Sequence, residues 1–254
     1  MGRFRKVSCP DCDASFSVPV FGGRFTFFNK QPVYCDDCVA TKIQAQEKER
    51  KVQELQLRCN EAIEADLLTE QFRTASFSES SKEIEAGNPE AWKSARKWTG
   101  RDNLYICGGV GTGKTFMALC ALRWHFDAGR TVAEVTARRF TKVIDRFDEG
   151  RGMLAAWKKA DVLLLDDIDK AQWTLDRIDG LWDLLNARMS AGRRSILTGN
   201  VSLPALVTLM RENARNTNSS TISTARVDAA LERLKPVTVI EMTGGSLRAM
   251  SLDQ

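Results

Sequence analysis

A glycine-rich stretch lies between two apolar segments, residues 104–107 and 116–122, and fits the pattern G-x-x-x-x-G-K-S/T of a phosphate-binding loop. Its glycines let backbone N–H groups turn toward phosphate oxygens without Cβ clashes, and the following helix aims its positive end at the same charge. Lys114 would reach the β- and γ-phosphates, and the Thr115 hydroxyl would hold Mg²⁺. The alternative, a glycine-rich turn that matches by chance, is disfavoured by the flanking strand and helix. The stretch is Gly108, Gly109, Val110, Gly111, Thr112, Gly113, Lys114 and Thr115.

Two adjacent acids follow the apolar run at residues 162–165. The run reads Val-Leu-Leu-Leu, which is typical of a parallel strand buried on both faces, and Asp166 and Asp167 come next. Ligands of such sheets bind at the carboxyl ends of the strands. We therefore expect Asp166 near Thr115, supporting Mg²⁺ through water, whereas Asp167 could polarise an attacking water. The acids alone are a weak signal, but together with the glycine-rich loop they indicate a nucleotide-hydrolysing site.

Four of the seven cysteines form two C-x-x-C pairs near the N-terminus: Cys9, Cys12, Cys35 and Cys38. The segment between the pairs alternates apolar and polar residues and contains a Gly-Gly turn, so the pattern predicts a hairpin with a four-cysteine zinc site. No ligand position is left open, so the zinc would be structural, and a segment this short needs the metal's binding energy to fold. The alternatives are a redox dithiol and unrelated cysteines. Such a module could bind DNA or protein.

Composition narrows the class of protein. The 254 residues carry 37 basic and 33 acidic side chains, a formal net charge of +4, which permits nucleic-acid contact without arguing for it. No apolar run is long enough to cross a membrane, and the basic N-terminus is not followed by the apolar core of a signal peptide. We therefore expect a cytoplasmic protein with no membrane partner.

The amino-acid composition and pattern of the chain change twice. These changes predict a zinc-binding module at 1–39, a helical linker at 40–72 and a nucleotide-binding, ATPase-like domain at 73–254. The linker lacks Pro and Gly, and its Glu47–Lys51 and Glu54–Arg58 pairs have the favourable i,i+4 order. It could be a solvated spacer or a rod that carries the zinc module to a partner.

Strand-like and helix-like segments alternate through the large domain, which predicts an α/β fold with a parallel sheet flanked by helices. We expect residues 150 and 152, both glycines, to interrupt the helices, and the polar residues 213–224 to form a loop. The expected strands are 103–107, 131–136, 161–166, 194–198 and 236–242; the expected helices are 114–128, 137–148, 153–159, 175–190, one after residue 204, and 226–234.

These motifs together resemble the AAA+ ATPases of the DnaC/DnaI helicase-loader and IstB transposition-helper group over roughly residues 70–250. The resemblance rests on the glycine-rich loop, on Leu-Leu-Leu-Asp-Asp-Ile-Asp at 163–169 and on Leu-Thr-Gly-Asn at 197–200. Glu-Arg-Leu at 232–234 is similar to the group's Asp-Arg-Leu box. Gly-Ser-Leu-Arg at 245–248 is similar to its terminal Ser-Tyr-Arg segment, with Leu in place of the aromatic.

The resemblance implies roles for further residues. Asn200 would be the polar residue near the γ-phosphate, and Arg233 would reach the ATP of a neighbouring subunit, with Arg226 as a competitor. An arginine supplied in trans stabilises the charge that develops on the transferred phosphoryl group, so a homo-oligomer is expected. AAA+ proteins usually carry Asp-Glu where this chain has Asp166-Asp167, and the shorter second acid predicts weak ATPase activity.

The function that the resemblance implies is an ATP- and Mg²⁺-dependent loader of a hexameric replicative helicase, bacterial or phage-encoded. The zinc module and linker would grip the helicase, and the AAA+ domain would engage single-stranded DNA. A basic helix face could line the DNA path or simply be solvated; its residues are Arg138, Arg139, Lys142 and Arg146. The alternatives are an IstB-like transposition helper on duplex DNA and a nucleotide-binding adaptor without hydrolysis.

Overall fold

The computed structural model describes residues 3–20, 33–77, 82–215 and 220–245, which divide into two compact units. One unit is Met1–Arg58 and the other is Cys59–Gln254. The helix α1 (Asp36–Glu64) begins in the first unit and ends in the second. The domain boundaries expected after residues 39 and 72 stay predictions.

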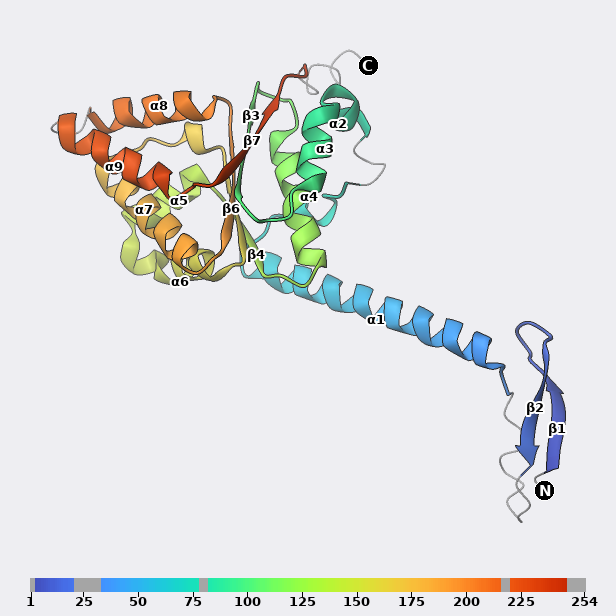
Figure 1. Ribbon diagram of the computed structural model, residues 1–254. Coiled ribbons are helices and arrows are strands. Elements are labelled where there is room, and N and C mark those ends of the chain that lie inside the picture. The colour runs from blue at the N-terminus through green and yellow to red at the C-terminus, as the bar shows by residue number, and fades with distance from the viewer. Residues whose placement is uncertain (1–2, 21–32, 78–81, 216–219, 246–254) are drawn as a thin grey trace. The chain divides into compact units, whose positions relative to one another are not determined.

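The first unit holds an antiparallel hairpin and most of α1 (Figure 1). The strands β1 (Arg3–Ser8) and β2 (Ser15–Val20) pair with Ser8 opposite Ser15, close to the tight loop that joins them. The helix begins earlier than predicted, because Asp36 and Asp37 stabilise its positive end, so Cys38 lies in its first turn. The Gly-Gly turn of the predicted hairpin falls outside the described residues.

The second unit is built on a five-stranded sheet whose strands are all parallel, as the sequence predicts. The spatial order is β4-β5-β6-β3-β7, so β6 separates the strand before the glycine-rich loop from the strand before the paired acids. All strands end at the same edge, and the chemistry-bearing residues therefore meet there. The strands are β3 (Asn103–Gly108), β4 (Val132–Thr136), β5 (Val162–Asp166), β6 (Arg194–Gly199) and β7 (Val237–Met242).

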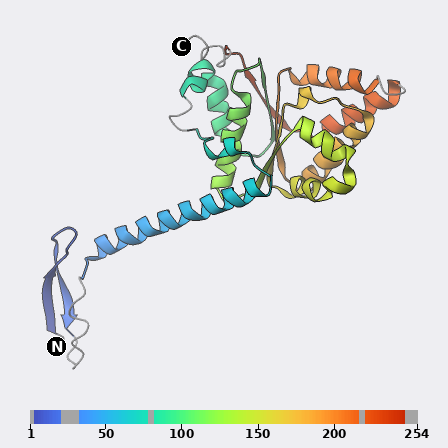
Figure 2. The ribbon, with the colours of Figure 1, turned by 180° about the vertical axis from the view of Figure 1, so that it is seen from behind.

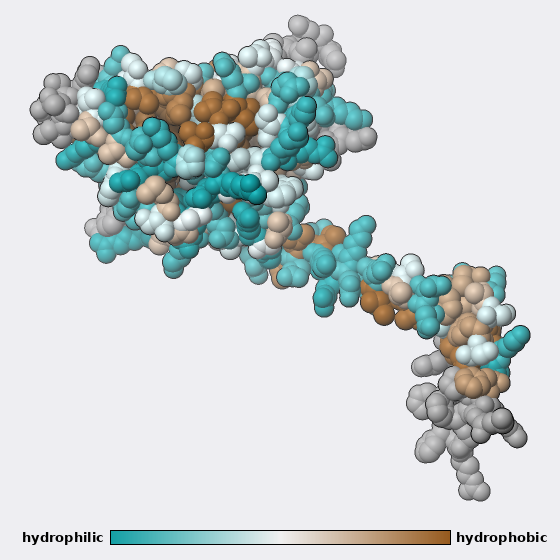
Figure 3. Space-filling model, viewed as in Figure 1, coloured by the Kyte–Doolittle hydropathy of each residue, from teal (hydrophilic) through white to brown (hydrophobic). Residues whose placement is uncertain are grey.

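Helices cover both faces of this sheet (Figures 1 and 2). One face carries α2 (Lys82–Gly87), α3 (Pro89–Lys97) and α4 (Lys114–Asp127). The other carries α5 (Ala137–Asp145), α6 (Phe147–Lys159), α7 (Leu175–Ser190), α8 (Leu203–Arg215) and α9 (Ser220–Glu232). On the side of the molecule shown in Figure 3, apolar residues gather around β7, the strand at one edge of the sheet, and Val239 of β7 is exposed.

Two local expectations are wrong. The polar segment expected to be a loop is largely helical, because α8 runs to Arg215 and α9 already begins at Ser220. Nor do the glycines at 150 and 152 interrupt the chain, since α6 passes through both. Each glycine costs a helix about 1 kcal/mol, and the burial of Leu154 and Trp157 outweighs that cost.

A buried arginine joins three elements of the core. Arg188 on α7 is 1% exposed, and its Nη1 donates to the carbonyls of Trp157 at 2.6 Å and Ala160 at 2.7 Å. Its Nε donates to the Ser195 hydroxyl of β6 at 3.0 Å. Burial lowers the pKa of Arg188 to about 9, and the charge is compensated by carbonyl oxygens. The end of α6 is thereby fixed to α7 and β6.

The buried His125 predicts an acid-sensitive stability. Its ring lies edge-on to Trp98 and Trp124, 4.9 Å from each between centroids, and among the described residues neither ring nitrogen has a hydrogen-bond partner. Burial, with the charge of Arg130, lowers the pKa of His125 from 6.5 to about 4. Between these values the unfolded chain takes up a proton that the folded chain does not, so the free energy of unfolding falls as pH falls.

Urea unfolding at about pH 7.5 and about pH 5 should therefore show a larger loss of stability for the wild type than for His125→Gln. Equal losses in the two proteins would show that His125 does not titrate on unfolding.

Candidate nucleotide site and metal centre

The glycine-rich loop connects β3 to α4 as the motif requires. Gly108 has φ +146°, and a Cβ there would lie 2.2 Å from the carbonyl oxygen of Met242 at the end of β7, so only glycine fits. Gly113, with φ +91°, precedes the first turn of α4. Within the loop, the Thr112 hydroxyl and the Lys114 ammonium both donate to the Gly109 carbonyl, at 2.9 Å and 2.6 Å. These two hydrogen bonds join the two ends of the loop, and both end on the same carbonyl oxygen.

Asp166 lies between two threonine hydroxyls. The Thr115 hydroxyl is 3.0 Å from one carboxylate oxygen of Asp166 and 3.2 Å from the other, and the Thr198 hydroxyl of β6 also donates to this carboxylate. Burial raises the pKa of Asp166, the Thr198 hydrogen bond opposes that shift, and the charge of Asp167 adds to it. A hydroxyl and a carboxylate at this separation fit the oxygen ligands that Mg²⁺ prefers. Thr198 is a residue that the sequence analysis missed, although it lies inside the quoted Leu-Thr-Gly-Asn phrase.

Asp167 and Asn200 lie at the same edge but have partners of their own. The Asp167 backbone is left-handed, with φ +55°, and its N–H donates to the Thr198 hydroxyl at 2.9 Å. Its carboxylate forms an ion pair with Lys170 at 2.8 Å. The Asn200 amide donates to the Asp169 carboxylate at 2.8 Å. Lys170 and Asp169 were not singled out from the sequence, because a charge in a loop has no motif of its own.

Lys114, Asp167, Lys170 and Asn200 line one cavity of about 370 Å³, which we call the phosphate cavity. Burial lowers the pKa of Lys114 within it. Thr115 also lines a neighbouring cavity of about 400 Å³, which Asp166 and the buried Glu134 share. Gln71 and Thr74, from the segment after α1, are lining residues that no sequence pattern indicated. The lining of the first cavity is Gln71, Thr74, Val110, Gly111, Gly113, Lys114, Thr115, Phe116, Asp167, Lys170 and Asn200.

The two candidate trans arginines lie elsewhere on the same unit. Arg226 pairs with Asp179 at 2.6 Å, and the Arg233 guanidinium lies 5.8 Å from the ring centre of Trp182. Both arginines line a separate cavity of about 370 Å³ and neither lines the Lys114 cavity. The structure of one chain therefore does not bring Arg233 to the phosphate site.

The basic face of α5 is partly engaged within the second unit. Arg139 forms an ion pair with Asp66, and Arg138 Nε donates to the Lys170 carbonyl at 3.4 Å. Arg139, Lys142 and Arg146 line a further cavity of about 560 Å³.

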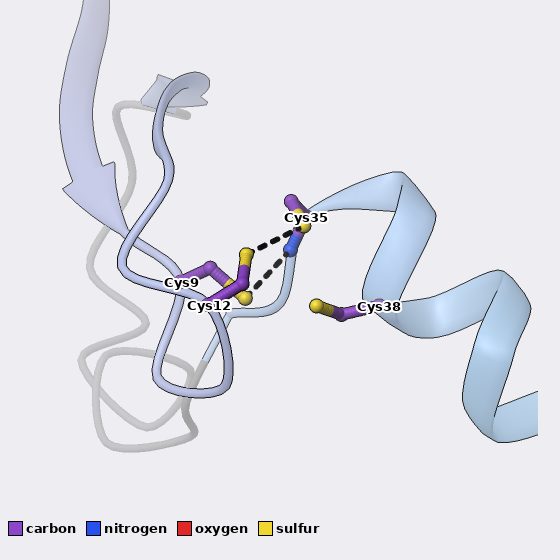
Figure 4. A group of neighbouring side chains, drawn as sticks. All are labelled: Cys9, Cys12, Cys35 and Cys38. Atoms are coloured by element: carbon purple, nitrogen blue, oxygen red, sulfur yellow. Dashed lines mark hydrogen bonds between the residues drawn. The ribbon is translucent and has the colours of Figure 1, made fainter.

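The four cysteines of the first unit converge on one point (Figure 4). Their sulfur atoms all lie within 4.8 Å of one another, and none of the four is in a disulfide. The Cys12 and Cys35 sulfurs are 3.5 Å apart, and the Cys35 N–H donates to the Cys9 sulfur at 3.4 Å. A tetrahedral ion with Zn–S bonds of about 2.3 Å separates its sulfurs by about 3.8 Å. The cluster therefore fits zinc.

The surroundings of Cys9 favour its thiolate form, whereas hydrogen bonds with the neighbouring cysteines raise the pKa of Cys38. Burial raises the pKa of Cys9, but the N–H groups of Cys35, Asp11 and Cys12 outweigh it and lower that pKa to about 6. Lys42 of α1 pairs with Asp11 at 2.8 Å and lies 3.4 Å above the Tyr34 ring. These contacts fix the start of α1 to the loop that carries Cys9 and Cys12.

No family model matches the sequence, but solved structures resemble it. A crystal structure of DnaI superposes with a TM-score of 0.53 at 20% identity, covering 70% of this chain and 93% of that one. The DnaC helicase loader gives 0.46 at 17% identity over 68% of this chain and 99% of that one. The replication initiator DnaA bound to AMPPCP and single-stranded DNA gives 0.43 at 16% identity over 65% and 46%. The likeness to DnaI shows a shared fold, and the parallel α/β sheet flanked by helices that the sequence predicts is confirmed.

Among the described residues, no helix combines the length and apolarity that crossing a membrane demands.

The four-cysteine cluster predicts one bound zinc ion per chain. Full-length protein purified without chelator is expected to hold one zinc ion at the four cysteines, and Cys38→Ser should lower the zinc content severalfold, because a structural site needs all its ligands. Metal analysis by mass spectrometry measures this. Cys59→Ser is the matched control, since Cys59 lies outside the cluster. Equal zinc in wild type and Cys38→Ser would exclude the cluster as the binding site.

Proposed function

We propose that this protein is an ATP-dependent loader of a replicative DNA helicase, acting in the cytoplasm during replication initiation. The observation that carries the proposal is the convergence of Lys114, Thr115 and Asp167 with Asn200 on one cavity, next to Asp166, in a fold similar to DnaI. The resemblance of residues 70–250 to the helicase-loader group supports the same function.

In this proposal the residues of the cavity divide the work of phosphoryl transfer. The loop N–H groups and Lys114 bind the ATP phosphates, and Thr115 and Asp166 hold Mg²⁺, Asp166 through water. Asp167 orients and polarises the attacking water, and Asn200 contacts the γ-phosphate. Bound Mg²⁺ would neutralise charge on the phosphates. Hydrolysis is slow and acts as a switch.

Arg233 completes the site from a neighbouring copy, so the active form is a homo-oligomer. Its position over Trp182, outside the cavity of its own chain, is compatible with that role. Single-stranded DNA follows the basic residues of α5. The zinc module and α1 bind the hexameric helicase, so recognition of the partner is separate from nucleotide binding.

Asp167 provides the chemical test. Asp167→Ala should lower ATP turnover at least about tenfold, because the water loses its general base. Asp167→Glu should raise it, since the longer side chain advances the carboxylate by one methylene. Phosphate release by the assembled protein with Mg²⁺ measures both, and Asp183→Ala, an acid paired with Lys158 away from the cavity, is the control. Unchanged turnover in Asp167→Ala would remove Asp167 from the mechanism.

The partner is tested by co-purification with the host's replicative helicase in ATP and Mg²⁺. Full-length protein should form a complex, and a chain lacking residues 1–58 should not. This truncation keeps Leu67 and Phe72, whose contacts with Glu134 of β4 and Phe126 of α4 lie within the second unit. Absence of a complex, with ATP-dependent filaments on duplex DNA, would replace the proposal with a transposition helper. Stabilisation by ATP without phosphate release would replace it with a non-hydrolysing adaptor.

A further inference from the structure

Lys170 lies in the phosphate cavity but has no role in the function proposed above. It ends a short 3₁₀ turn, η4 (Ile168–Lys170), directly after Asp167. Its ammonium is 2.8 Å from the Asp167 carboxylate, and its side chain lines the same cavity as Lys114 and Thr115. The cavity therefore holds a second cation next to the acid that would orient water.

The backbone of this turn is fixed from several sides. Ile168 is fully buried, and its carbonyl accepts from the Trp173 indole at 2.8 Å. The Lys170 N–H donates to the Asp167 carbonyl at 3.0 Å, and Arg138 contacts the Lys170 carbonyl at 3.4 Å. The Lys170 side chain, in contrast, is 38% exposed. A fixed backbone with a solvated four-carbon side chain lets the ammonium exchange one partner for another without moving the fold.

Two ammonium groups, those of Lys114 and Lys170, line the cavity together with one carboxylate, that of Asp167. Burial lowers the pKa of Lys114, the charge of Asp167 opposes that shift, and the charge of Lys170 adds to it. Burial raises the pKa of Asp166, and the charge of Lys170 opposes that shift, so its field reaches across the site. Lys114 is already oriented toward the loop, 2.6 Å from the Gly109 carbonyl, whereas Lys170 is directed to Asp167. The terminal phosphate of a nucleoside triphosphate carries enough negative charge to pair with both ammonium groups.

We propose that Lys170 recognises the γ-phosphate: it pairs with Asp167 in the nucleotide-free chain and transfers to the terminal phosphate when a triphosphate binds. This inference rests on the nucleotide site of the proposed function. The exchange has two consequences. Lys170 makes the site discriminate triphosphate from diphosphate, and its departure frees the Asp167 carboxylate to contact water only when the γ-phosphate is present.

The test is equilibrium binding of AMPPCP and ADP, each with Mg²⁺, to full-length protein by calorimetry. AMPPCP is used because it is not hydrolysed at the β–γ position. Lys170→Gln should weaken AMPPCP binding roughly tenfold and ADP binding less than about twofold, because a charged hydrogen bond is lost only to the third phosphate. Lys170→Arg should retain most of the discrimination. Lys93→Gln on α3 is the matched surface control and should behave as wild type.

A second variant tests the exchange itself. Asp167→Asn removes the partner that Lys170 must leave, so AMPPCP should bind roughly two- to fivefold more tightly, with ADP unchanged. Equal weakening of AMPPCP and ADP by Lys170→Gln, or no weakening, would overturn the role of Lys170 while leaving the nucleotide site intact. Failure of the wild type to bind either nucleotide would overturn the proposed function as well.

Discussion

The candidate nucleotide site depends on a buried carboxylate that two hydroxyls hold in place. Asp166 ends β5, Thr115 belongs to the first turn of α4, and Thr198 lies near the end of β6, so three elements meet at one side chain. Burying a charge is costly, and the raised pKa of Asp166 reflects that cost. The hydroxyl hydrogen bonds offset part of it and fix the direction of the carboxylate. The same contacts align the glycine-rich loop after β3 with the strand that carries the acids.

The segment that follows α1 is part of the same site. The Leu67 carbonyl accepts from the N–H of Glu134 at 2.8 Å, so the segment pairs with the free edge of β4, and the Thr69 N–H donates to the Glu134 carboxylate. Phe72 stacks edge-on against Phe126 of α4 at 5.4 Å. A few residues of chain therefore join the end of α1, the sheet edge and, through Gln71 and Thr74, the wall of the phosphate cavity. The end of α1 and the wall of this cavity are therefore joined by one short, well-packed segment.

Much of this architecture could be predicted because it depends on local patterns. The alternation of strands and helices predicts the parallel sheet, and the spacing of the glycines before Lys114 and Thr115 predicts a phosphate-binding loop. The partners of the acids could not be predicted in that way. Thr198 reaches Asp166 only because β6 lies between β3 and β5, and Lys170 reaches Asp167 only because the turn after β5 is left-handed at Asp167. The helical residues 213–215, 220–224 and 150–152 were missed because tertiary burial outweighs weak local propensity.

The two units differ in how much apolar surface they bury. The cysteine spacing is therefore the main structural signal in the sequence of the first unit. The second unit buries a large apolar core, in which Trp157, Trp173 and Leu181 pack together. Among the described residues of the first unit, Cys9 alone is buried, and the hairpin has two strands. A hairpin of that size is marginal in water. Metal ligation by the four cysteines, which the cluster geometry fits, would supply stability that hydrophobic burial does not supply there. Most described side chains of the first unit are exposed, so its surface contributes little to a core and could change without loss of buried apolar area.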